Sequence, residues 1–189
     1  MSKKVKIGIL GCADVAYRHA INALKSTVNA EVVSIASRNP SKAKKWASHF
    51  DIGAENSYEA LLANKNIDAV YVPLPIGLHK EWVFKAARAG KHIICEKSLA
   101  ESFHSVKEMV IECQSQNLVL YENFVCDFHP QHEKIMSIIK SGEIGKPFIF
   151  QSFFGFPPFN KNNHKYRYQL KHKILPIALD RRTYHCSKE

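Results

Sequence analysis

The chain has 189 residues, 46% of them apolar, which is enough to bury one full hydrophobic core and a small appendage. No stretch is apolar enough to span a bilayer, and the basic start leads into a strand instead of a signal peptide, so we expect a cytoplasmic protein without membrane contact. The net charge of +10 is concentrated late in the chain, because eight of the 27 Lys and Arg but only two of the 17 Asp and Glu lie in residues 161–189. This distribution argues against a nucleic-acid partner and suits an anionic small molecule.

The first expected element is an apolar strand over residues 5–10, which runs into a turn of sequence Gly11-Cys12-Ala13-Asp14-Val15-Ala16 and a predicted helix over residues 14–26. A glycine turn between a strand and a helix brings backbone N–H groups up to the diphosphate of a dinucleotide. Such turns also serve only to pack a helix closely on a sheet. Ala13 replaces the usual second glycine and restricts the approach of a diphosphate, so both interpretations stay open at this point.

A second apolar strand over residues 31–37 completes a βαβ unit and favours the dinucleotide. A carboxylate that closes this strand would bind the ribose hydroxyls of NAD, but here the strand ends in Ser37-Arg38-Asn39. A guanidinium offers planar donors to phosphate, and the Ser37 hydroxyl adds another. Arg38 could equally be a solvated loop arginine, as most are. Its position favours NADP(H) over NAD(H) as the cofactor.

The following residues continue to alternate between strand and helix. Further strands are predicted over 69–73, 92–95 and 118–121, and further helices over 41–50, 58–63, 79–89 and 103–116. Ser57 and Ser102 are predicted helix N-caps, and Gly90 is a predicted C-terminal stop. The last helix is expected to bury one face, made of Phe103, Val106, Met109, Val110 and Cys113. This pattern predicts an α/β fold, a doubly wound parallel (Rossmann) sheet.

The pattern changes near residue 124, where we expect a second domain to begin. A helix is predicted over 130–141 and a glycine turn over 142–145. A long aromatic strand should follow over 146–156, with Phe148, Phe150, Phe153, Phe154 and Phe156 in the core. The predicted organisation is a nucleotide-binding domain over 1–123, the start of an incomplete α+β substrate domain over 124–170, and a divergent basic tail over 171–189.

The cysteines and histidines do not predict a metal site. The five cysteines are odd in number and form no CxxC pair, which suits buried thiols in a reducing compartment; they are Cys12, Cys95, Cys113, Cys126 and Cys186. His129 and His132 have a spacing that can place two imidazoles on one helical face, but Pro130 lies between them and no third ligand is evident. We expect these histidines to cap a helix or to line a substrate cleft.

Several motifs in register resemble the glucose–fructose oxidoreductase/inositol dehydrogenase (Gfo/Idh/MocA) family of NAD(P)-dependent sugar oxidoreductases. They are the Gly8–Ala16 turn, Val72-Pro73-Leu74-Pro75 with His79, Ala89-Gly90-Lys91-His92 and Cys95-Glu96-Lys97. Within the family the chain is most similar to NDP-hexose 3-ketoreductases. That similarity rests on Gly11-Cys12-Ala13-Asp14, Tyr71-Val72-Pro73-Leu74-Pro75, Glu122-Asn123-Phe124, His129-Pro130-Gln131-His132 and Phe156-Pro157-Pro158.

The resemblance implies a role for each matching position. Cofactor-binding residues would be Gly11, Cys12, Ala13, Asp14, Val15, Ser37, Arg38, Leu74, Pro75, His79, Glu96 and Lys97. Leu74, Pro75 and His79 would lie beside the nicotinamide half. Lys97 would be catalytic, since an ammonium after the fourth strand can polarise a carbonyl as hydride arrives. An arbitrary lysine would simply be solvated, but the order Glu-Lys after an apolar strand favours the functional role.

Three departures from the family matter. Ile76 stands where the family usually carries an asparagine, so a polar contact near the nicotinamide would be lost. Ser98 replaces the proline that usually follows the lysine, so the usual cis bond could relax to trans and move the Lys97 ammonium. Past Tyr168 the family's glycine-rich turn and Asp-x-Gly-x-Tyr helix are replaced by basic sequence. Asp180 and Tyr184 keep the family's offset, so Tyr184 is a candidate proton donor or a coincidence. A frameshifted, truncated reading frame would also produce this tail.

Two function classes therefore remain. The first is an NADPH-dependent oxidoreductase that reduces C3 of a nucleotide-linked 3-keto-6-deoxyhexose, with a sugar nucleotide as its small-molecule partner. The second is a non-catalytic remnant that at most binds the cofactor. Homo-oligomers are possible for the full-length family and doubtful for this chain, whose 146–156 strand would be an exposed edge.

Overall fold

The structure is a computed structural model that describes residues 3–151. These residues fall into two compact units, residues 3–123 and residues 124–151, which are described separately. Across residues 3–151, every helix is too short or too polar to cross a membrane.

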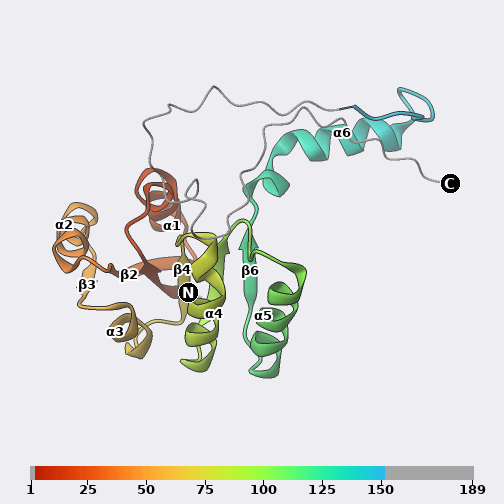
Figure 1. The fold of residues 1–189 in the computed structure, drawn as a ribbon. Helices are drawn as coiled ribbons and strands as arrows, with labels where there is room; N and C mark the ends of the chain where they lie inside the picture. Colours follow the sequence, from red (N-terminus) through yellow and green to blue (C-terminus); the bar gives the residue numbers. More distant parts are fainter. Residues whose placement is uncertain (1–2, 152–189) are drawn as a thin grey trace, which may run out of the picture. The chain divides into compact units, whose positions relative to one another are not determined.

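The first unit is built on a six-stranded parallel sheet with strand order β3-β2-β1-β4-β5-β6 (Figure 1). This order and the all-parallel pairing confirm the predicted doubly wound sheet. The strands are β1 (Val5–Leu10), β2 (Ala30–Ala36), β3 (Gly53–Glu55), β4 (Ala69–Val72), β5 (His92–Glu96) and β6 (Leu120–Asn123).

Helices cover both faces of this sheet because its central strands are apolar on both sides. One core cluster packs α3 (Tyr58–Ala63), α4 (Ile76–Arg88) and α5 (Phe103–Ser115) against one face. The other packs the π-helical turn η1 (Ala16–Ala20), α1 (Ile21–Ser26) and α2 (Pro40–Phe50) against the opposite face. Every residue of β4 is buried, as expected for a strand enclosed on both faces.

Capping residues set the helix ends where the sequence predicts them. The hydroxyl of Ser57 accepts from Ala60 N at 3.0 Å, and that of Ser102 accepts from Ser105 N at 3.2 Å. Gly90 follows α4 with φ +70°, a conformation that glycine adopts without a steric penalty. The predicted caps and the C-terminal stop are therefore confirmed.

Three details of this unit differ from the sequence predictions. The short strand β3 was not predicted, because three residues are too few to show an alternating pattern. Helix α4 begins at Ile76, directly after Pro75, three residues before the predicted start. Phe103 is 83% exposed although it was assigned to the buried face of α5. It is the first residue of that helix, and the buried residues Met109 and Cys113 come only later in it.

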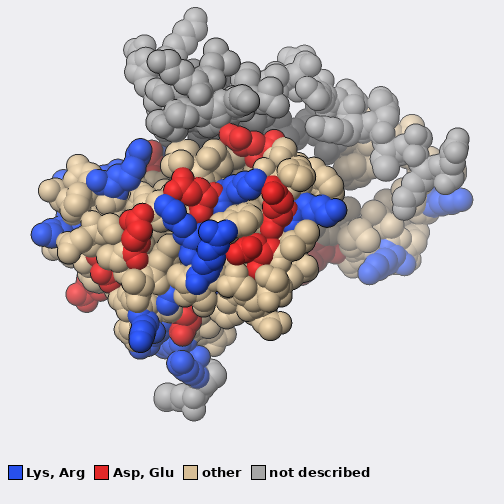
Figure 2. All heavy atoms as spheres, turned by 60° about the horizontal axis from the view of Figure 1, so that its bottom comes forward, with Lys and Arg blue, Asp and Glu red and all other residues tan. Residues whose placement is uncertain are grey.

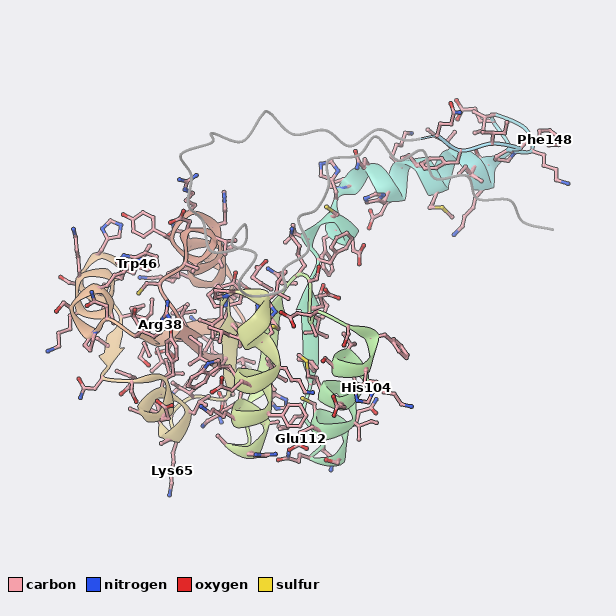
Figure 3. All side chains as sticks on the ribbon, viewed as in Figure 1. Arg38, Trp46, Lys65, His104, Glu112 and Phe148 are labelled. Carbon is pink, nitrogen blue, oxygen red and sulfur yellow. The ribbon has the colours of Figure 1, made fainter. Side chains whose placement is uncertain are left out.

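The second unit contains a short 3-10 helix, η2 (Val125–Phe128), and α6 (Pro130–Ser141). His129 is the N-cap of α6, and its Nδ1 accepts from Gln131 N at 3.2 Å, so the capping role is confirmed. The strand predicted from residue 146 is wrong for residues 146–151, which have no regular structure. Phe148 and Phe150 are 87% and 66% exposed, and Figure 3 shows the Phe148 side chain at the periphery of this unit. A strand needs a hydrogen-bonded neighbour, and residues 124–151 contain no second strand to provide one.

Charged side chains of both signs are interspersed over the face drawn in Figure 2. Lys85 lies between Glu81 at 2.6 Å and Glu59 at 3.7 Å, and Lys80 lies 2.6 Å from Glu108. These pairs are partly exposed, so each contributes little to stability. Alternating signs give this face no extended field of one sign.

Candidate functional site

A groove opens where the strand order reverses, between the neighbouring strands β1 and β4. The chain leaves β1 toward one face of the sheet and leaves β4 toward the other, and open α/β sheets bind ligands at this point. The groove has a volume of about 250 Å³. Its lining combines the turn after β1, the end of β2 and the turn after β4: Gly11, Cys12, Ala13, Ser37, Arg38, Asn39, Lys42, Tyr58, Pro73, Leu74, Pro75 and Leu78.

Gly11 shapes the floor of this groove. Its φ is +121°, which side-chain-bearing residues rarely adopt, and a Cβ would lie 2.8 Å from Leu74 Cδ2. Helical backbone follows, and Tyr17 N donates to Ala13 O at 3.1 Å. Backbone N–H groups at the start of a helix are suited to an anion.

The end of β2 brings cations to the same groove. Arg38 is exposed, and Figure 3 places it between α2 and α3. Ser37 is buried, and its Oγ accepts from Asn39 N at 3.2 Å. Lys42, in the first turn of α2, donates from Nζ to Cys12 O at 2.8 Å. Two cations and a hydroxyl therefore surround one end of the groove.

A second hollow of about 310 Å³ adjoins the groove and shares Ser37, Arg38, Tyr58 and Leu78 with it. The rings of Tyr58 and Trp82 meet edge to face in this hollow, with centroids 4.8 Å apart. Burial raises the pKa of the Tyr58 phenol, an effect that a hydrogen bond donated by the Arg38 backbone N–H partly offsets. Tyr58 is therefore neutral near pH 7, so it interacts with Arg38 by hydrogen bonding or stacking and forms no ion pair with it.

Cys12 is half-buried in the turn itself. Burial raises the pKa of its thiol, and the hydrogen bond with Ser37 and the charge of Lys42 offset only part of this effect. The thiol is consequently protonated near neutral pH. It contributes to the shape of the groove and has no nucleophilic character there.

Glu96 is the last residue of β5, the neighbour of β4, and Lys97 follows it directly. Glu96 Oε1 accepts from Tyr71 Oη at 2.7 Å and from Asn123 Nδ2 at 2.6 Å. The Lys97 side chain is exposed. The peptide bond between Lys97 and Ser98 is cis, so the expectation that serine relaxes it to trans is wrong.

His79 connects the turn after β4 to the segment after β5. It is 0% exposed, on the first turn of α4. Its Nε2 lies 2.7 Å from Leu74 O, and its Nδ1 lies 3.0 Å from Ser98 O and 3.2 Å from Leu99 O. From the other side, Leu99 N donates to Glu122 Oε1 at 2.8 Å. The segment that follows Lys97 is thus held from two elements.

The structure brings most of the predicted cofactor residues together. Seven of them line the groove: Gly11, Cys12, Ala13, Ser37, Arg38, Leu74 and Pro75. Asp14 and Val15 lie at the start of the helix that follows, and Glu96 and Lys97 lie at the end of β5. His79 is buried between loops and does not line the groove. Tyr184, the candidate proton donor, lies outside the described residues.

Sequence reasoning missed Lys42, Tyr58, Tyr71 and Asn123. A signal existed for Lys42, because a cation in the first turn of a helix opposes the helix dipole and so calls for another partner. Tyr71 and Asn123 stand within motifs that carry the family resemblance, but the sequence assigned neither of them a role. Their importance depends on which strands are neighbours.

The arrangement fits a dinucleotide. A turn with positive φ next to a helix start suits a diphosphate, and the cations at the end of β2 suit a further phosphate on the adenosine ribose. An acidic residue at the end of β2 would have opposed such a phosphate, and none lines the groove.

Comparison with known proteins agrees with this geometry. The family described as "Oxidoreductase family, NAD-binding Rossmann fold" (GFO_IDH_MocA) matches residues 5–124. The chain is 41% identical over 90% of its length to a dTDP-3,4-didehydro-2,6-dideoxy-alpha-D-glucose 3-reductase of Saccharopolyspora spinosa. It is 39% identical over 79% of its length to a D-xylose 1-dehydrogenase (NADP(+)) of Haloferax volcanii. The matches cover 51% and 46% of these relatives.

Among solved structures, the chain is similar to KijD10, a 3-ketoreductase from Actinomadura kijaniata, crystallised with NADP and TDP-benzene. The TM-score is 0.81 at 38% identity, covering 89% of this chain and 51% of that one. The chain spans about half the length of the curated relatives that it matches. The chain belongs to the Gfo/Idh/MocA oxidoreductase family. Its residues 5–124 match the family's NAD-binding Rossmann fold.

Proposed function

We propose that this chain binds NADP(H) in the groove at the β1–β4 junction. The observation that carries the proposal is the grouping of Ser37, Arg38 and Lys42 at the end of β2, next to the Gly11 turn. A guanidinium and an ammonium there match the extra phosphate that distinguishes NADP from NAD. The relatives named above agree, since the KijD10 crystals contain NADP and the H. volcanii enzyme is named for NADP(+).

The proposed activity is reduction of a keto group on a sugar, at C3 of a nucleotide-linked 3-keto-6-deoxyhexose. NADPH, when bound, supplies the hydride. The exposed Lys97 ammonium lies at the carboxyl edge of the sheet, where it can stabilise negative charge that grows on a carbonyl oxygen. Tyr184 is the proposed proton donor, by the Asp-to-Tyr offset in the sequence alone.

The substrate class rests on the relatives and not on the described residues. Relatives of 41% and 39% identity over this half are named for different sugars, so identity at this level does not identify the sugar. Four relatives that match the chain share the 3-reductase name, which favours the nucleotide-linked 3-keto sugar.

A second candidate function is cofactor binding without turnover. The observation that favours it is the extent of the match, since the chain spans about half of each relative. The groove itself is formed within residues 11–78, so it does not require the second half.

One experiment separates these candidates. The 189-residue chain is titrated with NADPH, and NADPH oxidation is then followed with a dTDP-linked 3-keto sugar. A reductase shows turnover that Lys97→Ala lowers about 100-fold or more, as for loss of one transition-state donor. Lys107→Ala, which removes another exposed lysine, serves as the control. Saturable NADPH binding without turnover supports the second candidate, and no binding contradicts both.

A further inference from the structure

The ends of three neighbouring strands converge on one carboxylate, that of Glu96. In the parallel register Glu96 is paired with Asn123 of β6, while Tyr71 of β4 is paired with Ile94 of β5. Ile94 and Glu96 are two residues apart and therefore project on the same face of the sheet. The register alone thus places Tyr71, Glu96 and Asn123 on a common face at the carboxyl edge.

Both hydrogen bonds in this group end on the same oxygen. Tyr71 Oη donates to Glu96 Oε1 at 2.7 Å, and Asn123 Nδ2 donates to it at 2.6 Å. Bonds to a carboxylate are about twice as strong as neutral ones, and a carboxylate can accept about four in total. Within residues 3–151, Tyr71 and Asn123 both donate to Oε1, and Oε2 accepts no hydrogen bond from a protein donor. Half of the acceptor capacity of Glu96 is therefore committed and half is available.

Tyr71 holds its hydroxyl rigidly. The side chain is 1% exposed and packs in the core cluster beneath α1 and α2. Burial, together with the hydrogen bond and charge of Glu96, raises the pKa of the phenol far above its usual range, so the hydroxyl is a donor at any physiological pH. A buried tyrosine hydroxyl generally has a polar partner, and here Glu96 accepts its hydrogen bond.

We propose that Tyr71 and Asn123 are positioning residues that orient Glu96, so that Oε2 accepts a hydrogen bond from the nicotinamide riboside half of NADP(H). The donor on the ligand is a ribose hydroxyl or the carboxamide N–H. This inference rests on the proposed function, because it requires the dinucleotide to lie across the carboxyl edge from the Gly11 turn to β5. It assigns recognition of the adenosine half to Arg38 and of the other half to the Tyr71–Glu96–Asn123 group.

The test compares two ligands that differ in the relevant half. NADPH contains the nicotinamide riboside, whereas 2′,5′-ADP contains only the phosphorylated adenosine. Tyr71→Phe keeps the buried ring and removes the hydroxyl, and Asn123→Leu keeps the approximate side-chain shape. Each is expected to weaken NADPH binding about three- to tenfold, as for loss of one hydrogen bond, with 2′,5′-ADP binding unchanged. Tyr17→Phe, which removes a hydroxyl outside the groove lining, is the matched control.

A double-mutant cycle with Glu96→Ala tests whether these residues act through Glu96. In that background Tyr71→Phe and Asn123→Leu should no longer change NADPH affinity. The proposal is overturned if both variants bind NADPH like the wild type, or if they weaken it equally with and without Glu96. It is also overturned if 2′,5′-ADP binding falls in parallel, since that result indicates a general structural effect. If the wild type binds 2′,5′-ADP and NADPH equally well, this proposal fails while the adenosine site stands; if it binds neither, the proposed function fails as well.

Discussion

The two sides of the candidate site are built differently. On the β1–β2 side, Arg38 and Lys42 are exposed cations next to a glycine turn, and Lys42 has one hydrogen bond to a backbone carbonyl. On the β4–β6 side, His79 and Tyr71 are almost fully buried and connect side chains and backbone of neighbouring elements.

This difference follows from what each side is proposed to bind. A phosphate can be bound by cations on flexible stems together with backbone N–H groups, because charge attraction tolerates small displacements. A reacting carbonyl and a nicotinamide must be held within a narrow geometry, because about 1 Å of displacement can cost roughly 100-fold in rate. The affinity for the cofactor should therefore depend mainly on the β1–β2 side, which we call the first side. The orientation of the nicotinamide should depend mainly on the β4–β6 side, which we call the second side.

The largest effect is expected from Gly11→Ala, which disrupts the first side. An alanine at this position would have to adopt a φ of +121°, and its methyl would lie 2.8 Å from Leu74 Cδ2. We expect the free energy of unfolding to fall by about 2 kcal/mol and NADPH affinity to fall at least about tenfold. Gly90→Ala is the control, since its φ is also positive but a Cβ has nothing within 4 Å. Chemical denaturation and NADPH titration measure both; unchanged affinity in Gly11→Ala would contradict the role of this turn.

His79→Ala should disrupt the second side with a loss of about 2 kcal/mol in the free energy of unfolding. The change leaves the carbonyls of Leu74, Ser98 and Leu99 without this partner and opens a cavity in a buried position. His104, labelled in Figure 3, is 82% exposed, so His104→Ala is the matched control with little expected effect. Equal melting temperatures for the two variants would show that His79 does not connect the loops.

Arg38→Ala is expected to change the preference for NADPH over NADH. Loss of one charge-assisted contact at an exposed site should weaken NADPH binding about tenfold and leave NADH binding nearly unchanged. Lys44→Ala, an exposed lysine of α2 outside the groove lining, should change neither. An equal loss of affinity for NADPH and for NADH would mean that Arg38 does not bind the extra phosphate of NADPH.

The smallest effect is a pH dependence on the second side. Because the pKa of Tyr71 is raised by burial and by Glu96, the folded state keeps this proton while the unfolded state loses it above about pH 10. Its stabilisation is therefore complete below pH 10 and is lost as the pH rises further, by about 1.4 kcal/mol at pH 11. Tyr71→Phe should show a flatter decline in unfolding free energy between pH 9 and pH 11. Superimposable pH profiles would contradict the burial of this phenol.

The sequence predicted the first side of the site better than the second. Gly11, Ser37 and Arg38 follow directly from a strand–turn pattern, in which residue type and position along the chain carry the information. The Tyr71–Glu96–Asn123 group joins residues up to 52 positions apart and depends on strand order and register. A single sequence shows neither, and a tyrosine inside an apolar strand resembles any other core residue.

The same distinction between local pattern and strand pairing explains where the fold predicted from the sequence was wrong. Long helices and buried strands have patterns that local sequence determines, so their positions were predicted within a few residues. The strand expected from residue 146 failed over residues 146–151 because alternation describes a strand that has a partner, and no second strand lies within residues 124–151. Phe148 alternates as a core residue would, yet it is exposed.

NADP(H) binding in the groove is tested by calorimetric titration of the 189-residue chain with NADPH and with NADH under identical conditions. We expect one saturable site, with NADPH bound about tenfold more tightly than NADH because of the contacts at the end of β2. Absence of heat with both coenzymes, or equal affinity for the two, would contradict it.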